Sequence, residues 1–337
     1  MRVHHTIIPL LLALPPSALP AQQARVAELG RCATEGGAWA EECRLTYRTY
    51  GRLNAARDNA VLIPTWYAGR SEDMTWMLGA DAWVDTTRYF AVLVDALGNG
   101  ASTSPSTSKA QPGRRFPRIT IGDMVMAEHR LITETLGLRR LHAVLGWSMG
   151  GMQAIEWAHR FPGTATRVAA VAGTPRMATY DMYFVRMTLT LLDHAEARGL
   201  PPRELARQLT ELWHLVGMSP AQENTVPRDS VDAMIARELE LEFLRLHPED
   251  NRLHMQAIGA FDRLGGATAT PSGASSSRML LVFFPEDHVT TAGHMRAYAA
   301  RTGADTVAIA SPYGHMAAPF EAATIGRHLR AWLDAPR

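Results

Sequence analysis

The chain has 337 residues, of which 47% are hydrophobic and 20% charged, a balance that excludes a disordered or fibrous protein. Lys and Arg number 34 and Asp and Glu 33, so the formal net charge of +1 provides no basic excess for binding nucleic acid. Two cysteines are too few for a disulfide scaffold or a multi-cysteine zinc site. The length suffices for one large domain or two small ones.

The first 21 residues have the pattern of a secretory signal. Arg2 gives a basic tip, residues 6–14 are apolar, and prolines and small side chains follow. We expect cleavage after Ala21, or alternatively after Ala18, and hence a periplasmic or secreted protein. A membrane anchor or a frayed tail is the alternative, but four prolines between residues 9 and 20 do not suit a spanning helix. No later segment reaches spanning length without a charge, so no membrane span is expected after signal removal.

Export changes the interpretation of the two cysteines. Cys32 and Cys43 lie 11 residues apart and flank Glu35–Ala38, a glycine-containing stretch typical of a tight turn. The alternating residues 44–50 that follow indicate a strand. Cysteines that flank a hairpin pair in an oxidising compartment, so we expect a disulfide here. Two buried free thiols are the alternative.

Six short apolar runs occur along the chain, with helical patterns between them. Continuous apolar runs of this length fit strands that are buried on both faces of a parallel sheet. Strand alternating with helix predicts an α/β fold with a mostly parallel sheet and helices on both faces. The runs are Ala60–Ile63, Tyr89–Val94, Leu141–Leu145, Val168–Ala172, Met279–Phe284 and Asp305–Ala310, and the helical patterns are residues 122–136, 149–159 and 321–333.

The alternation stops between about residues 176 and 264, where only helical patterns occur. We expect them to form a cap over the sheet, inserted before the last two strands, with a low-complexity return linker at residues 265–277. The core would then comprise residues 22–175 and 278–337, and the cap with its linker residues 176–277. The expected cap helices are residues 179–197, 202–215, 229–246 and 251–264.

The strongest chemical signal is Gly146-Trp-Ser148-Met-Gly150, which directly follows one apolar run and directly precedes a helix. This is G-x-S-x-G in the strand–turn–helix context that it requires. The glycines let the backbone turn tightly, so the Ser148 hydroxyl stands above the sheet edge, and the helix from Met149 points its amide end there. Ser148 is therefore the expected nucleophile. A small-residue turn that packs a helix on a strand is the alternative.

A serine hydroxyl needs a base, and in this arrangement the partners follow in the order serine, acid, histidine. The fifth apolar run is followed by Glu286 and Asp287, and the last run by a loop that ends in His315. Both loops should open at the sheet edge that carries Ser148. We expect His315 to take the serine proton and Asp287 to hold the imidazole and stabilise its charged form, with Glu286 as the competing acid.

The oxyanion of a tetrahedral intermediate needs two amide donors. Met149 is expected to supply one and the loop after Ala60–Ile63 the other, with Tyr67 as the candidate, although Trp66 and Tyr67 could also be pocket wall. No H-x-H or H-E-x-x-H motif occurs, so we expect neither a metal nor a cofactor. The other histidines, His288 among them, are expected in surface or core roles.

Several segments of the core carry a likeness to a known family. They are Thr46–Asn54, Asp58–Leu62, Asp85–Phe90, Leu97–Gly98 with Ser104–Ser106, Ile119–Met124, Gly150–Ala158 and Ser311–His315. Together they resemble the homoserine O-acetyltransferases of the α/β-hydrolase superfamily, over about residues 45–175 and 279–333. The resemblance implies an α/β-hydrolase fold and an acyl-enzyme on Ser148. It also implies Asp287 and His315 as partners and Tyr67 and Met149 as oxyanion donors.

The departures from the family bear on the substrate. The family usually has glycine where Trp147 stands, and an aspartate that holds the amino group of homoserine where Met316 follows His315. We place no counterpart of the family's carboxylate-binding arginine in this cap. A lost charged partner in a buried site weakens recognition strongly. Acetyl-CoA is also not expected outside the cytoplasm, so the resemblance favours water as the acyl acceptor.

We therefore interpret the chain as an exported serine hydrolase that cleaves a small-molecule ester, with an amide as the alternative substrate. An O-acyltransferase is the runner-up. A non-catalytic binding protein on the same fold is a third hypothesis, opposed by the intact set of Ser148, Asp287 and His315. No nucleic-acid partner is expected. The apolar residues Leu241, Phe243, Leu244 and Leu246 could pair two caps into a homodimer or could simply face the sheet.

Overall fold

A computed structural model describes residues 22–241, 247–265 and 277–335. The predicted signal and most of the predicted return linker lie outside the described residues, as does most of the apolar segment that was considered for dimerisation. Among the described residues, no helix is both long and apolar enough to cross a membrane.

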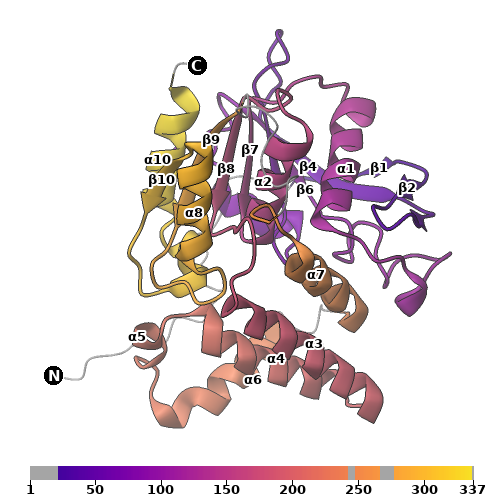
Figure 1. The fold of residues 1–337 in the computed structure, drawn as a ribbon, viewed down its shortest axis with the longest axis vertical. Helices are drawn as coiled ribbons and strands as arrows, with labels where there is room; N and C mark the ends of the chain where they lie inside the picture. The colour runs from indigo at the N-terminus through magenta and orange to yellow at the C-terminus, as the bar shows by residue number, and fades with distance from the viewer. Residues whose placement is uncertain (1–21, 242–246, 266–276, 336–337) are drawn as a thin grey trace.

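Eight strands form one sheet, in the order β1-β4-β6-β5-β7-β8-β9-β10 (Figure 1). Strand β4 is antiparallel to both of its neighbours, β1 and β6, and the other pairs are parallel. This confirms the predicted mostly parallel sheet, and each of the six apolar runs supplies one strand. The strands are β1 Arg25–Glu28, β4 Arg44–Tyr50, β5 Ala60–Pro64, β6 Phe90–Val94, β7 Ala143–Trp147, β8 Arg167–Val171, β9 Arg278–Phe283 and β10 Asp305–Ala308.

The central strands are buried on both faces, which explains why their sequences are continuously apolar. In β5, Ala60 and Leu62 pack into one part of the core, and Val61 and Ile63 pack into the other. Helices lie on both faces, as predicted. The first face is covered by α1 Ile121–Arg130, α2 Met149–Arg160 and α8 Ala292–Thr302, and the second by α10 Ala322–Asp334 with the 3₁₀ segment η1 Ser71–Met77.

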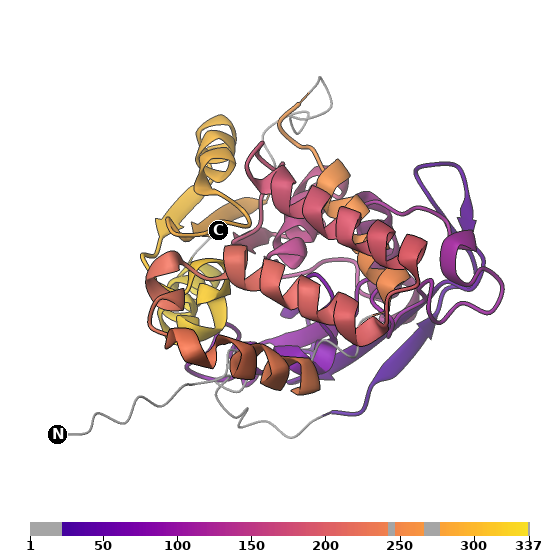
Figure 2. The same cartoon turned by 90° about the horizontal axis from the view of Figure 1, so that it is seen from below.

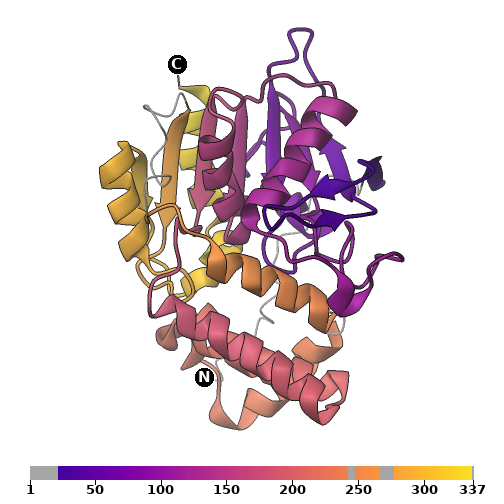
Figure 3. The ribbon, with the colours of Figure 1, turned by 45° about the vertical axis from the view of Figure 1, so that its right-hand side comes forward.

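Residues 181–241 and 247–260 form a layer of helices, here called the helical layer, below the sheet (Figures 1 and 3). Figure 2 shows α3, α4 and α6 side by side across this end of the molecule. Helix α7 packs against α3 and lies between it and the sheet (Figure 3). The helices are α3 Asp181–Arg198, α4 Pro202–Gly217, the short α5 Pro220–Glu223, α6 Val231–Leu241 and α7 Pro248–Ala260.

Two helices, α1 and α7, have bounds that differ by several residues from the predicted ones. The predicted helix over residues 122–136 ends as α1 at Arg130 and continues as a wider π-helical turn, Leu131–Thr135. Helix α7 begins at Pro248 rather than at residue 251, because proline suits a first helical position, and the preceding His247 caps it. It ends at Ala260 instead of residue 264, because the chain then turns back toward the sheet.

The two cysteines close a small hairpin near the start of the described chain. Strand β2, Cys32–Ala33, pairs with β3, Trp39–Ala40, and Cys32 is bonded to Cys43 with a Cα–Cα distance of 5.6 Å. The predicted disulfide is therefore confirmed. Closing a loop of this size stabilises a fold by roughly 3 kcal/mol in the chain-entropy model.

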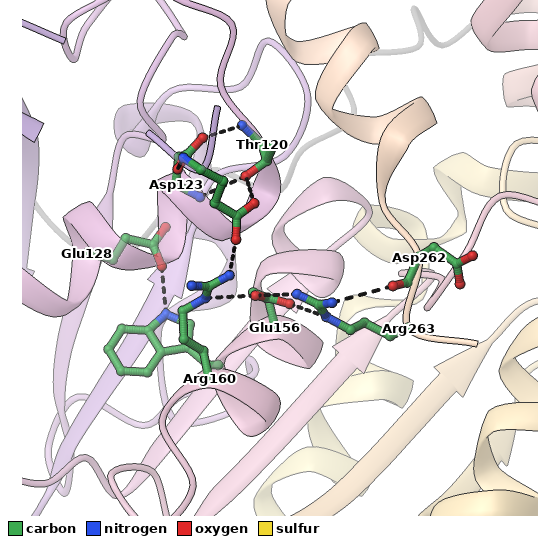
Figure 4. A network of polar contacts seen from close by, with 9 residues as sticks. Thr120, Asp123, Glu128, Glu156, Arg160, Asp262 and Arg263 are labelled. Carbon is green, nitrogen blue, oxygen red and sulfur yellow. Dashed lines mark hydrogen bonds and ion pairs between the residues drawn. The ribbon is translucent and has the colours of Figure 1, made fainter. Parts of the chain in front are cut away.

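A network of ion pairs joins this hairpin to the helix that follows β7 (Figure 4). Glu156 of α2 is fully buried and accepts hydrogen bonds from Arg160 at 2.9 Å and from Arg263 at 2.5 and 2.6 Å. Arg160 also pairs with Glu35 of the hairpin. Since Arg263 follows α7, the network holds together the hairpin, α2 and the end of the helical layer.

Within the helical layer, a partly buried histidine lies between two glutamates and joins α4, α5 and α6. His214 Nδ1 lies 3.0 Å from Glu223 Oε1, and Nε2 lies 2.9 Å from Glu238 Oε2. Burial lowers the pKa of His214, but the hydrogen bonds to the two carboxylates outweigh burial and raise that pKa to about 9. The imidazole is therefore charged at neutral pH.

We expect this contact to stabilise the protein fully below the ordinary histidine pKa of about 6.5 and progressively less as the pH rises through about 9. The wild-type melting temperature should exceed that of His214→Gln most at about pH 6, and the difference should shrink toward about pH 10. His194→Gln, at an exposed position of α3, is the control and should show no such trend. A difference that is constant across this pH range would contradict the assignment.

Candidate active site

Ser148 lies in a strained turn between β7 and α2. Its φ of 56° and ψ of −122° are disfavoured for residues with a side chain. A Cβ on Gly146 would lie 2.0 Å from the carbonyl oxygen of Gly150, and one on Gly150 would lie 2.5 Å from that of Pro64. Both flanking positions therefore require glycine, which is the physical reason for the G-x-S-x-G pattern.

The structure brings Ser148, His315 and Asp287 together from three loops at one sheet edge. These loops follow β7, β10 and β9, respectively. His315 Nε2 lies 2.8 Å from Ser148 Oγ, and His315 Nδ1 lies 2.7 Å from Asp287 Oδ2. Both His315 and Asp287 are buried. In this geometry the imidazole can take the serine proton while the carboxylate holds the ring.

Asp287 is fixed by hydrogen bonds from the residues that follow it. Its Oδ1 accepts from the amides of Val289 at 2.7 Å and Thr290 at 2.8 Å, and its Oδ2 accepts from the Thr290 hydroxyl at 2.9 Å. The Thr290 hydroxyl also lies 2.9 Å from the carbonyl oxygen of Ala172, which follows β8. The sequence interpretation gave Thr290 no role, because a threonine in a loop carries no distinctive signal.

Glu286 was the competing candidate for the acid. Its carboxylate accepts a hydrogen bond from the backbone amide of Ser311 at 3.2 Å, in the loop that leads to His315. The structure therefore places Asp287, and not Glu286, against the imidazole.

The two candidate oxyanion donors are on adjoining segments. Tyr67 and Met149 both line the cavity that contains Ser148. Within the part of the chain that the structure describes, neither backbone amide donates to another protein group. Gln153, buried on α2, donates from Nε2 to the carbonyl oxygens of Thr65 at 3.0 Å and Met149 at 3.3 Å. Gln153 thus ties together the two segments that carry the candidate donors.

The cavity has a volume of about 270 Å³, and an aromatic wall lies next to the candidate nucleophile. The Trp66 and Trp147 ring centroids are 4.8 Å apart, and Trp76 lies edge-on to Trp147 at 6.1 Å. Trp213 of α4 lies edge-on to His315 at 6.0 Å, so the helical layer contributes to the wall. Four Trp side chains thus line the cavity that contains Ser148.

Another part of the cavity lining is polar and comes largely from α7. It includes Arg70, Asp250, Asn251 and His254. Burial lowers the pKa of His254 to about 4, so this imidazole is neutral at neutral pH, and its Nε2 lies 3.0 Å from the carbonyl oxygen of Leu97. Among the described residues, no group of three His, Cys, Asp or Glu side chains lies close enough to hold a metal ion.

Comparison with known proteins identifies the family. The alpha/beta hydrolase fold family matches residues 61–322, which is most of the sequence. This protein is a member of the α/β-hydrolase fold family. A probable esterase of Corynebacterium glutamicum is 32% identical over 284 residues, which cover 77% of this chain and 80% of that protein. The solved structure of an acetyl esterase superposes with a TM-score of 0.85 at 26% identity, over 93% of this chain and 97% of the other.

Within the α/β-hydrolase fold family, the chain is also similar to homoserine O-acetyltransferases. The enzyme of Geotalea uraniireducens is 39% identical over 150 residues, which cover 39% of this chain and 40% of that protein. This confirms the resemblance that the core segments carry. The relatives thus include both esterases and acyltransferases.

Proposed function

We propose that this protein is a serine esterase that cleaves short-chain esters through an acyl-enzyme on Ser148. The observation that carries the proposal is the hydrogen-bonded series Asp287–His315–Ser148 at the wall of a cavity. The similarity to a probable esterase and to an acetyl esterase supports it. In this proposal residues 22–175 and 278–337 form the catalytic core, and residues 176–277 form the cap that selects the substrate.

The geometry suggests the following course of reaction. Ser148 Oγ attacks the ester carbonyl as His315 Nε2 takes its proton, and the amides of Tyr67 and Met149 stabilise the oxyanion. His315 then gives the proton to the departing alcohol, which leaves the acyl group on Ser148. A water molecule then attacks the acyl carbon as His315 takes its proton, and the bond to Ser148 Oγ breaks as His315 gives that proton to Oγ, which releases the acid. Asp287 stabilises the imidazolium in both steps.

The dimensions of the cavity favour a small ester. Ligand pockets for drug-sized molecules measure about 300–1,000 Å³. A cavity of about 270 Å³ with Trp66, Trp76 and Trp147 in its wall suits an acetyl or similarly short acyl group with a small alcohol. The likeness to an acetyl esterase points to the same substrate class.

Acyl transfer to homoserine is the second candidate, because the similarity to homoserine O-acetyltransferases favours it. A transferase must hold its acceptor in place and keep water from the acyl-enzyme. Met316, which follows His315 and lines the cavity, has no charge with which to hold an ammonium group. Water is therefore the acyl acceptor in our proposal.

We expect the purified protein to hydrolyse p-nitrophenyl acetate without CoA, with kcat/KM at least about 10-fold higher than for p-nitrophenyl octanoate because of the cavity size. With acetyl-CoA and homoserine, free acetate rather than O-acetylhomoserine should form, as measured by mass spectrometry. Met316→Asp should not by itself create homoserine acetylation, because the new carboxylate offers a partner only to the ammonium group and none to the homoserine carboxylate. Efficient formation of O-acetylhomoserine by the wild type would replace hydrolysis with transfer as the function.

We further propose that the protein is exported, on the pattern of residues 1–21 and supported by the Cys32–Cys43 bond. Protein recovered from the native host should begin at Gln22 and weigh about 2 Da less than the fully reduced chain, because one disulfide removes two hydrogens. Intact-mass measurement before and after reduction checks both points. A retained N-terminal segment together with two alkylatable thiols would contradict export.

A further inference from the structure

Helix α7 links the helical layer to two loops of the core, the one after β5 that contains Tyr67 and the one after β6 that contains Leu97 and Ser106. It lies against the core side of the layer (Figure 3). Side chains within its first two turns make the contacts, so they project from one part of the helix toward the core. The contacts are the hydrogen bonds Asp250–Ser106, Asn251–Tyr67 and His254–Leu97.

The bond between Asn251 and Tyr67 is the one that reaches a candidate oxyanion donor. The Tyr67 hydroxyl donates to Asn251 Oδ1 at 2.5 Å. Asn251 is only 2% exposed, and its Nδ2 donates to the carbonyl oxygen of His247 at 3.3 Å, which fixes the amide end that meets Tyr67. Burial raises the pKa of Tyr67, so the phenol remains a donor at neutral pH.

The loop around Tyr67 has a conformation that needs support from outside. Ala68 has a φ of 58°, in the left-handed region that residues with a side chain disfavour. Gly69 donates its amide to the carbonyl oxygen of Trp66 at 3.1 Å, and a Cβ on Gly69 would lie 2.6 Å from the Trp66 ring. The loop is thus a tight, strained turn, and its conformation sets the direction of the Tyr67 amide.

We propose that Asn251 is a positioning residue for the oxyanion hole, acting through the side chain of Tyr67. This inference rests on the proposed function, in which the Tyr67 amide is an oxyanion donor. Tyr67 then contributes its amide to the reaction and its hydroxyl to the link with α7. Because α7 belongs to the helical layer, the oxyanion hole is correctly shaped only while the layer is docked on the core.

Tyr67→Phe and Asn251→Leu each remove this hydrogen bond and keep the side-chain volume nearly constant. We expect each to lower kcat for p-nitrophenyl acetate by about 10- to 100-fold, with KM changed by less than about 2-fold, because a misplaced donor weakens the transition state more than the ground state. The double variant should be no slower than the slower single variant, because both changes delete one bond. Asn251→Asp keeps an acceptor oxygen and should retain more activity than Asn251→Leu.

A second measurement separates a positioning role from a general loosening of the fold. Methylboronic acid forms a tetrahedral adduct with a catalytic serine and places an oxygen in the oxyanion hole. Its Ki should rise in Tyr67→Phe and Asn251→Leu by about the factor by which kcat falls. Ser106→Ala is the matched control, because it removes a bond from α7 to a different loop; its kcat and Ki should stay within about 2-fold of the wild type.

The outcomes separate this proposal from the proposed function. Ester hydrolysis by the wild type and its loss in Ser148→Ala are measured first, and failure there overturns both proposals. If they hold and Tyr67→Phe leaves kcat and Ki unchanged, the positioning role alone is overturned. A large effect of Tyr67→Phe with none from Asn251→Leu also overturns it, because the hydroxyl then acts by itself. If Asn251→Leu does not fold, Tyr67→Phe, which removes a single oxygen, decides the matter.

Discussion

Replacing Ser148 or His315 by alanine is expected to lower kcat/KM for ester hydrolysis by about 10⁴-fold or more, because the members of such a triad act as a unit. His315 Nε2 lies 2.8 Å from Ser148 Oγ, so removal of either group ends proton transfer from the serine. The double variant should be no slower than either single variant. Rates with p-nitrophenyl acetate, and labelling of the protein by a fluorophosphonate, are the measurements.

His194→Ala serves as the control for His315→Ala, because this histidine is exposed on α3 and does not line the cavity. Its rate should equal that of the wild type. If Ser148→Ala kept a substantial share of the wild-type rate and was still labelled, the nucleophile would have to be a different residue.

Asp287→Asn is expected to lower kcat by about 10³-fold, and the hydrogen bonds explain why. The amides of Val289 and Thr290 both donate to Asp287 Oδ1, so the oxygen of an asparagine must stay there. Its NH₂ group then faces His315 Nδ1, which must accept a hydrogen bond in place of donating one. The proton moves to Nε2, and this tautomer cannot accept the proton of Ser148.

Glu286→Gln is the matched control for Asp287→Asn. Glu286 accepts from the Ser311 amide through one carboxylate oxygen, and glutamine keeps such an oxygen. We expect a loss of less than about 5-fold for this variant. Equal losses in the two variants would show that Asp287 is not the acid of the triad. The comparison uses kcat measured under the same conditions for both proteins.

The sheet could be predicted from the sequence because its central strands are buried on both faces. A run such as Ala60–Ile63 has no polar position, which is typical of a strand in a sheet that is covered by helices on both faces. The helix boundaries were less predictable, because they depend on caps. Helix α7 starts at Pro248 because the side chain of His247 caps it. Helix α1 gives way to a wider turn at Leu131, although the periodicity of apolar residues continues unchanged there.

Ser148, Asp287 and His315 could be singled out because each stands just after a strand of one sheet, and parallel strands deliver their ends to one edge. The residues that support them could not be found in this way. Thr290, Gln153 and Asn251 act through hydrogen bonds, and each has a partner that is distant in the sequence: Ala172, Thr65 and Tyr67, respectively. Threonine and amide side chains are common in any chain, so only the fold reveals which of them meet a reacting group.

The helical layer leaves the sheet after β8 and returns at β9, and these two strands pair directly with each other. An insertion that begins and ends at neighbouring strands can change in length or sequence without altering the register of the sheet. In an evolving lineage this junction allows substrate preference to diverge while the sheet folds as before. A chimera that exchanges this segment between relatives should therefore fold, and it should keep its catalytic rate only where the incoming segment restores a partner for Tyr67.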